Sequence, residues 1–311
     1  MSNVGQAVRG EFLVGIQLSG KLWLGLVLAI TLVLWASAFT AIPIALESFS
    51  PGHLAVARQL LSAAVTIPGV LLLWRRELWP AIRTNFLLIL IMGLTGITFY
   101  HLALGAGQRT VGAGSASLLI NLGPLVTALL AAAILKERLT PRLIVGGLVA
   151  FLGASVLVLV GNGDFAFDWN AMLVVLAMVL QSFYFIIQRK LSFRYSAVAL
   201  ALLTIWVGAI TLLPWGSGVS QAITLASARS IWALIYLGCI CGVVPYIGWA
   251  LVLSRLPASR AGVWLYLIPP LSILIGWLVL NETPTLALLA SGAVILTGVV
   301  IAKSQPRKNA S

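Results

Sequence analysis

The chain has 311 residues, of which 61% are hydrophobic and only 8% charged, and its mean hydropathy is +1.09. A soluble domain carries about 25% charged residues, because its surface must present polar atoms to water. The composition therefore excludes a soluble enzyme, a disordered chain and a disulfide-stapled secreted module, and it indicates a polytopic membrane protein.

Apolar runs broken by charged or turn-forming residues predict ten transmembrane helices, since each run has about the 20 residues that cross a hydrocarbon core. The first run also resembles a signal peptide, with Lys21 before it and Ala36-Ser37-Ala38 as a possible cleavage site. Its apolar stretch continues to Leu46, so we expect a retained helix. The expected spans are 22–45, 53–74, 86–106, 112–135, 140–161, 169–188, 196–215, 230–253, 261–280 and 285–302.

The net charge of +12 follows the expected topology. With the N-terminus placed in the cytoplasm, sixteen of the nineteen Lys and Arg residues fall in inside segments. Arg109 and Arg229 fall outside, and Arg58 lies within a span. This is the positive-inside pattern, which predicts that both termini are cytoplasmic. It also accounts for the positive charge without a nucleic-acid partner.

An internal repeat emerges when the sequence is compared with itself at an offset of 145 residues. Coincident Pro, Glu and Gly residues at one fixed offset do not follow from apolar composition alone. They predict a first five-helix repeat over 22–161 and a second over 169–302, with cytoplasmic segments at 1–21 and 303–311. The coincident pairs include Pro124 with Pro269, Glu137 with Glu282, and Gly93 with Gly238.

The two repeats are expected to have opposite orientations, because each has an odd number of helices. Lys136-Glu137-Arg138 falls inside, whereas its counterpart Asn281-Glu282-Thr283 falls outside and has lost both cations while keeping the acid. Inverted repeats of this kind are typical of secondary transporters, which bind substrate near the midplane between the repeats.

Several motifs resemble one family over nearly the whole chain. They are Trp35-Ala36-Ser37-Ala38-Phe39, Arg58, Asn121-Leu122-Gly123-Pro124, Lys136 to Thr140, and Pro269 to Glu282. The sequence is similar to the drug/metabolite transporter superfamily, in its EamA-like ten-helix branch, and within it to bacterial exporters of aromatic amino acids. The resemblance implies a basket-like bundle in the bacterial inner membrane, a central cavity, alternating access and export. Gln181 departs from the family pattern, because many members have Trp there.

Twelve polar or aromatic residues are expected to line the cavity. An aromatic substrate needs stacking faces and a few hydrogen bonds, and the deep tyrosines lie too far from the surface for an interfacial belt. For the deep tyrosines and for Trp249 and Trp264, the alternative is a lipid-facing or interfacial position. For the residues around Trp35 and Gln181, the alternative is packing within the bundle. His101 has packing and a proton-carrying role as alternatives. The expected substrate-binding residues are Trp35, Ser37, Phe39, Tyr100, His101, Asn121, Gln181, Tyr184, Tyr246, Trp249, Trp264 and Tyr266.

Three prolines are expected to act as hinges, because each removes a backbone hydrogen bond within a span. They are Pro124 in the first repeat and Pro269 and Pro270 in the second, with static kinks as the alternative. The Gly238 to Gly242 spacing predicts close helix packing. So does the run of small residues at 112–117, for which capture of a carboxylate by backbone amides is the alternative.

Charged residues inside the spans are rare. No Asp or Glu is expected at mid-membrane depth, which argues against a cation-coupled pump or a metal transporter. We expect no cofactor and no metal site, since Cys239 and Cys241 are too few for one. Arg58 lies about 7 Å inside the outer end of its helix, where we expect it to snorkel to the interface or to cap neighbouring carbonyls, with substrate carboxylate binding as the alternative.

We expect a monomeric exporter of aromatic amino acids and similar hydrophobic solutes, whose partners are the substrate and the lipid bilayer. A broad-specificity drug or metabolite exporter on the same scaffold is the first alternative. An intramembrane hydrolase that pairs Ser115 or Ser117 with His101 is a remote one. We do not expect an enzyme.

Overall fold

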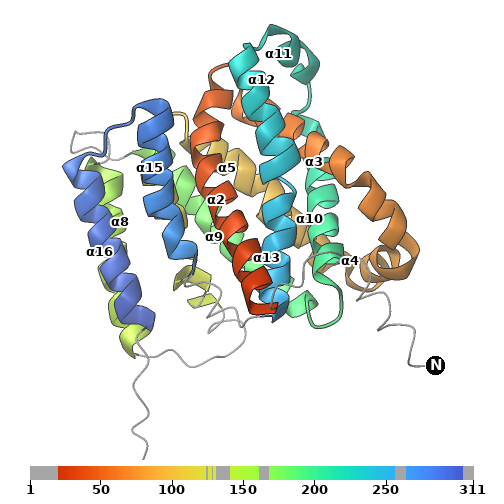
Figure 1. The fold of residues 1–311 in the computed structure, drawn as a ribbon, viewed down its shortest axis with the longest axis horizontal. Coiled ribbons are helices and arrows are strands. Elements are labelled where there is room, and N and C mark those ends of the chain that lie inside the picture. The colour runs from red at the N-terminus through yellow and green to blue at the C-terminus, as the bar shows by residue number, and fades with distance from the viewer. Residues whose placement is uncertain are drawn as a thin grey trace, which may run out of the picture.

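A computed structural model describes residues 20–123, 125–127, 129–130, 141–160, 168–255 and 264–303. Over these ranges the protein is all-helical and no strand occurs (Figure 1). The helices pack lengthwise against one another, and α2 (Gly20–Leu46) lies near the middle of the bundle in the view of Figure 1. The predicted all-α class is confirmed.

Within the ranges that the structure describes, five helical stretches are long and apolar enough to cross a membrane, and further apolar helices are shorter. The stretches are Leu22–Leu46, Pro51–Gly107, Trp169–Leu191, Ala197–Trp215 and Ala228–Arg255. The shorter helices, Ala113–Thr127, Ile144–Gly153, Ile268–Leu280 and Leu286–Gly298, fall in four other expected spans. Part of the expected span 112–135, including Pro124, lies outside the described residues, as does Glu137.

The Pro51–Gly107 stretch contains two of the expected spans joined by helical turns. Its 57 residues would extend about 85 Å as one straight helix, against about 30 Å for a hydrocarbon core. The chain instead folds back, because a Cβ on Gly105 would lie 3.4 Å from Pro51 Cβ. The segments are α3 (Pro51–Leu73), η1 (Trp74–Leu78), α4 (Trp79–Gly93), η2 (Leu94–Thr98) and α5 (Phe99–Gly107).

A second helix–π-helix–helix series lies in the C-terminal half. Gly238 and Gly242 bring it close to α3: a Cβ on Gly238 would lie 2.8 Å from the carbonyl oxygen of Arg58, and one on Gly242 would meet Ser62 Oγ. Ser62 Oγ also donates to the Gly238 carbonyl at 2.7 Å. The predicted close packing is confirmed. The series consists of α12 (Ala228–Ile235), η4 (Tyr236–Cys241) and α13 (Val244–Arg255).

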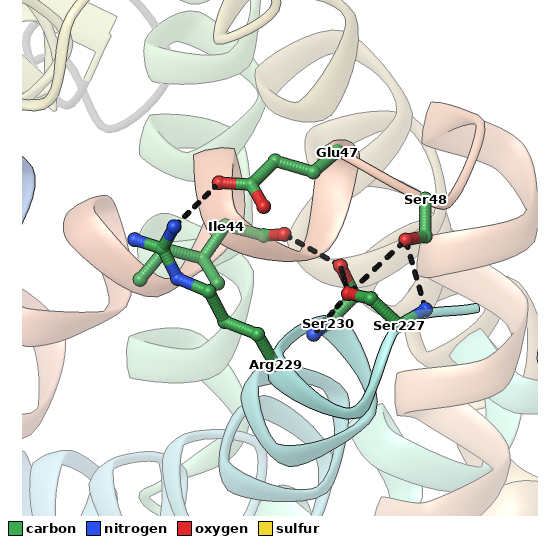
Figure 2. Close-up of polar contacts among 6 residues, drawn as sticks. All are labelled: Ile44, Glu47, Ser48, Ser227, Arg229 and Ser230. Carbon is green, nitrogen blue, oxygen red and sulfur yellow. Dashed lines mark hydrogen bonds and ion pairs between the residues drawn. The ribbon is translucent and has the colours of Figure 1, made fainter.

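The ends of α2 and α12 are tied together by polar contacts (Figure 2). Ser230 Oγ donates to the Ile44 carbonyl at 2.9 Å, and Arg229 pairs with Glu47 at 3.3 Å. Ser227 caps α12 by accepting from the Ser230 amide at 3.2 Å. We call this part of the bundle the Glu47 end. The start of α3 and the end of α5 also lie there.

The remaining helices complete the bundle. α8 and α16 run side by side (Figure 1), and a Cβ on Gly298 would meet the backbone of Ala150. Asp168 caps α9 by accepting from the Asn170 amide at 2.8 Å. The elements are α6 (Ala113–Ile120), α8 (Pro141–Val160), α9 (Trp169–Leu191), α10 (Ala197–Leu212), η3 (Leu213–Trp215), α11 (Val219–Leu225), η5 (Leu265–Leu267), α15 (Ile268–Leu280) and α16 (Leu286–Lys303).

Candidate substrate cavity

A cavity lies among helices from both halves of the chain, and its empty space of about 620 Å³ includes a part that is open to solvent. α2, α3, α5 and α6 line it from the N-terminal half, and α9, η4, α13, η5 and α15 line it from the C-terminal half. Most of its wall is apolar, with a few polar side chains among aromatic rings. This composition is typical of small-molecule sites.

Seven of the twelve expected site residues line this cavity together. Residues about 210 positions apart in the sequence therefore face the same cavity. A substrate site between the two expected repeats requires this arrangement. Their binding of a substrate stays a prediction. The seven are Trp35, Phe39, Tyr100, His101, Asn121, Gln181 and Tyr246.

Two further expected residues, Trp249 and Tyr184, pack behind the side chains that line the cavity. Trp249 is 2% exposed, and its ring centroid lies 5.4 Å from that of Trp35 and 5.7 Å from that of Phe185. Tyr184 is buried with its ring centroid 6.3 Å from that of Tyr246. These two residues hold the cavity rings in place rather than line the cavity.

The other expected residues lie elsewhere. Ser37 shares a hydrogen bond of 2.6 Å with the Tyr236 hydroxyl, so its side chain joins α2 to η4. Trp264 is 48% exposed and lines no part of the cavity. Tyr266 lies in η5, but its side chain is outside the described part of the structure. Pro269 and Pro270 occupy the first turn of α15, directly after η5.

Arg58 is the residue that sequence reasoning misplaced. The expected snorkelling is wrong, because Arg58 is only 5% exposed and lines the cavity from α3. Hydropathy indicates how deep a residue lies along a helix, but it does not tell which face of the helix an arginine occupies. The available signal was the charge itself, since an ionisable residue within a span marks a functional site by default.

Polar groups around the cavity are partly satisfied by the backbone. Tyr246 donates to the Gly96 carbonyl at 3.1 Å, and Asn121 Nδ2 donates to the Ser117 carbonyl at 2.8 Å. His101 Nδ1 and Arg58 Nε are buried and have no hydrogen-bond partner in the part of the chain that the structure describes. Among the described residues, no three His, Cys, Asp or Glu side chains gather as metal ligands.

The sequence matches the family model described as the EamA-like transporter family over residues 13–159 and again over 168–303. The uncharacterized transporter YdfC of Bacillus subtilis is 37% identical over 268 residues, 86% of each chain. The probable terminal-alkyne amino-acid exporter of Streptantibioticus cattleyicolor is 32% identical over 286 residues, 92% of this chain and 94% of its own. The probable amino-acid metabolite efflux pump of Salmonella typhimurium is 24% identical over 89% of this chain and 93% of its own.

A protein of known crystal structure shares the fold. It aligns with 90% of this chain and 96% of its own, with a TM-score of 0.60 and 22% sequence identity. The two family matches cover most of the sequence, and two of the three named relatives are described as exporters or efflux pumps. The chain is therefore a multi-pass membrane transporter that belongs to the EamA-like transporter family.

Proposed function

We propose that the chain exports aromatic amino acids and similar hydrophobic solutes through its central cavity by alternating access. The observation that carries this proposal is the cavity wall, where Trp35, Phe39, Phe185 and Tyr246 surround a few polar groups. Such a wall offers stacking faces for the ring of an aromatic amino acid and hydrogen bonds for the backbone atoms of that amino acid. The names of two relatives support an amino-acid substrate.

The proposed architecture is ten helices in two inverted repeats, 22–161 and 169–302, in a monomer. Support comes from the two family matches, 13–159 and 168–303. It also comes from the π-helices, because η2, shifted by 145 residues, overlaps η4. In this proposal the protein lies in a bacterial inner membrane, with the Glu47 end outside and both termini cytoplasmic.

A broad-specificity exporter of drugs or metabolites is the second candidate, favoured by the small number of polar groups in the cavity. The intramembrane hydrolase finds no support. Ser117 Oγ donates to the Gly114 carbonyl at 2.7 Å, and neither Ser115 nor Ser117 lines the cavity that His101 faces.

Counterflow in liposomes tests the proposal. The full chain, reconstituted and loaded with substrate, should take up labelled tryptophan and phenylalanine but not threonine or lysine, with and without a pH gradient. Alanine at His101 or at Tyr246 should reduce uptake. Equal uptake of all four amino acids would favour the second candidate, and unchanged uptake by both variants would overturn the site.

A further inference from the structure

Arg58 is a buried cation that the described part of the chain leaves without a counter-ion. The residue is 5% exposed, and among the described residues its Nε has no hydrogen-bond partner and no ion pair involves it. Removing a charge from water is costly unless a partner of opposite charge and hydrogen bonds compensate it. An arginine held in this way can meet a bound anion without first breaking an internal ion pair.

The acidic residues that the structure describes are all engaged at the ends of helical segments. Glu47 pairs with Arg229. Glu77 accepts from the Ser196 amide at 3.3 Å, and Asp168 caps α9. Glu282 accepts from the Ala113 amide at 3.1 Å. None of these acids lines the cavity, so the charged group described there is the guanidinium alone.

The position of Arg58 orients a ligand. A second, smaller cavity lies beside the first towards Pro51 and Gly105, and Arg58 and His101 line both. Trp35, Phe39 and other rings line only the first cavity. A solute with an aromatic ring among these side chains therefore presents its other end to Arg58 and to the unpartnered Nδ1 of His101.

We propose that Arg58 anchors the carboxylate of the transported solute, and that the α-ammonium group is dispensable. The planar guanidinium matches a carboxylate with two parallel hydrogen bonds. An ammonium group in the same cavity meets only neutral dipoles and ring faces, and Arg58 repels it. The cavity thus selects aromatic carboxylates. The aromatic part of this statement rests on the proposed function, whereas the carboxylate part rests on Arg58.

Two analogues of phenylalanine separate the contributions of the carboxylate and of the ammonium group. Each is tested as a competitor of labelled phenylalanine in the counterflow assay. 3-Phenylpropionate lacks the ammonium group and should compete within about threefold of phenylalanine. Phenylalaninamide lacks the carboxylate and should compete at least about tenfold more weakly. Equal competition by the amide and by phenylalanine would overturn the proposal, as would failure of 3-phenylpropionate to compete.

Variants of Arg58 test the residue itself, through ligand-induced shifts of the melting temperature of purified protein. Arg58→Gln should lower the affinity for phenylalanine and for 3-phenylpropionate by at least about tenfold. It should change the affinity for phenylalaninamide by less than about twofold. Arg229→Gln, at the half-exposed pair in Figure 2, is the control and should change none of them. The unliganded Arg58→Gln protein should melt no lower than the unsubstituted protein, because the variant removes an uncompensated buried charge.

The outcomes distinguish this inference from the proposed function. If 3-phenylpropionate binds and phenylalanine does not, amino-acid export fails while the carboxylate anchor stands. If phenylalanine and its amide bind equally, the anchor fails while amino-acid export stands. If neither phenylalanine nor 3-phenylpropionate binds, both amino-acid export and the carboxylate anchor are overturned. If Arg58→Gln lowers the affinity for the two carboxylates and for the amide equally, the anchor is overturned.

Discussion

Glu282 Oε2 accepts a hydrogen bond of 3.1 Å from the backbone amide of Ala113, the first residue of α6. This contact joins the end of α15 to the start of α6 across 169 residues of sequence. Asn281 turns the chain there with a left-handed φ of 56°. A Cβ on Gly112 would lie 3.1 Å from the same carboxylate oxygen, so the small residue admits Glu282.

The first prediction concerns this carboxylate. Glu282→Ala should lower the free energy of unfolding by about 1 kcal/mol, because a negative charge at a helix N-terminus interacts favourably with the unpaired amides. Chemical unfolding of the purified protein in mixed micelles measures the change. Glu47→Ala is the matched control, since its ion pair with Arg229 is about half exposed and should contribute less than about 0.5 kcal/mol. Equal losses for the two variants would contradict the role of Glu282.

The second prediction compares two glycines. Gly242→Ala should destabilise the protein by about 1–3 kcal/mol, because its Cβ would meet Ser62 Oγ, which is already held by the Gly238 and Arg58 carbonyls. Gly147→Ala, in α8, is the control, because no atom of the described residues lies within 4 Å of its Cβ position. That variant should be neutral or stabilised by up to about 1 kcal/mol. Melting temperatures in detergent would reveal the contrast.

Many of the residues that line the cavity could be predicted from the expected repeat and from the depth of aromatic residues in the expected spans. His101 and Tyr246, which correspond at the offset of 145, line the same cavity. The sequence did not indicate which aromatic residues face the cavity. Trp35 lines it and Trp249 lies behind Trp35, although the sequence predicts that both line the cavity. Facing depends on helix rotation, which tertiary packing sets.

The π-helices are the clearest feature that the sequence did not predict. η2 and η4 each insert a wider turn into a helix, and wider turns have no residue signature comparable to a proline kink. They change the rotation of the helix beyond them, and so the direction of His101 after η2. The rotation of a helix about its axis cannot be read from the sequence, and this also explains Arg58. Its position inside a span is predicted correctly, but the face of the helix that it occupies is not.

The third prediction separates a cavity wall from its support. Trp35→Ala should reduce counterflow while leaving stability within about 1 kcal/mol, because its half-buried ring faces the cavity. Trp249→Ala should cost about 3–5 kcal/mol, because it empties a fully packed position behind Trp35. Trp249→Phe should recover most of that loss, since it keeps a ring and removes an indole N–H that has no hydrogen-bond partner among the described residues. Counterflow and unfolding measured on the same preparations test the division.

The fourth prediction concerns the hydroxyl of Tyr246, which donates to the Gly96 carbonyl in η2 at 3.1 Å. Tyr246→Phe keeps the ring in the cavity wall but leaves that buried carbonyl without its donor, so it should cost about 1 kcal/mol of stability. Because the hydroxyl is already engaged by the backbone, phenylalanine affinity should change by less than about threefold. Tyr246→Ala should weaken affinity by about tenfold or more, since it removes the ring itself. A Tyr246→Phe variant as impaired in binding as Tyr246→Ala would show instead that the hydroxyl contacts the substrate.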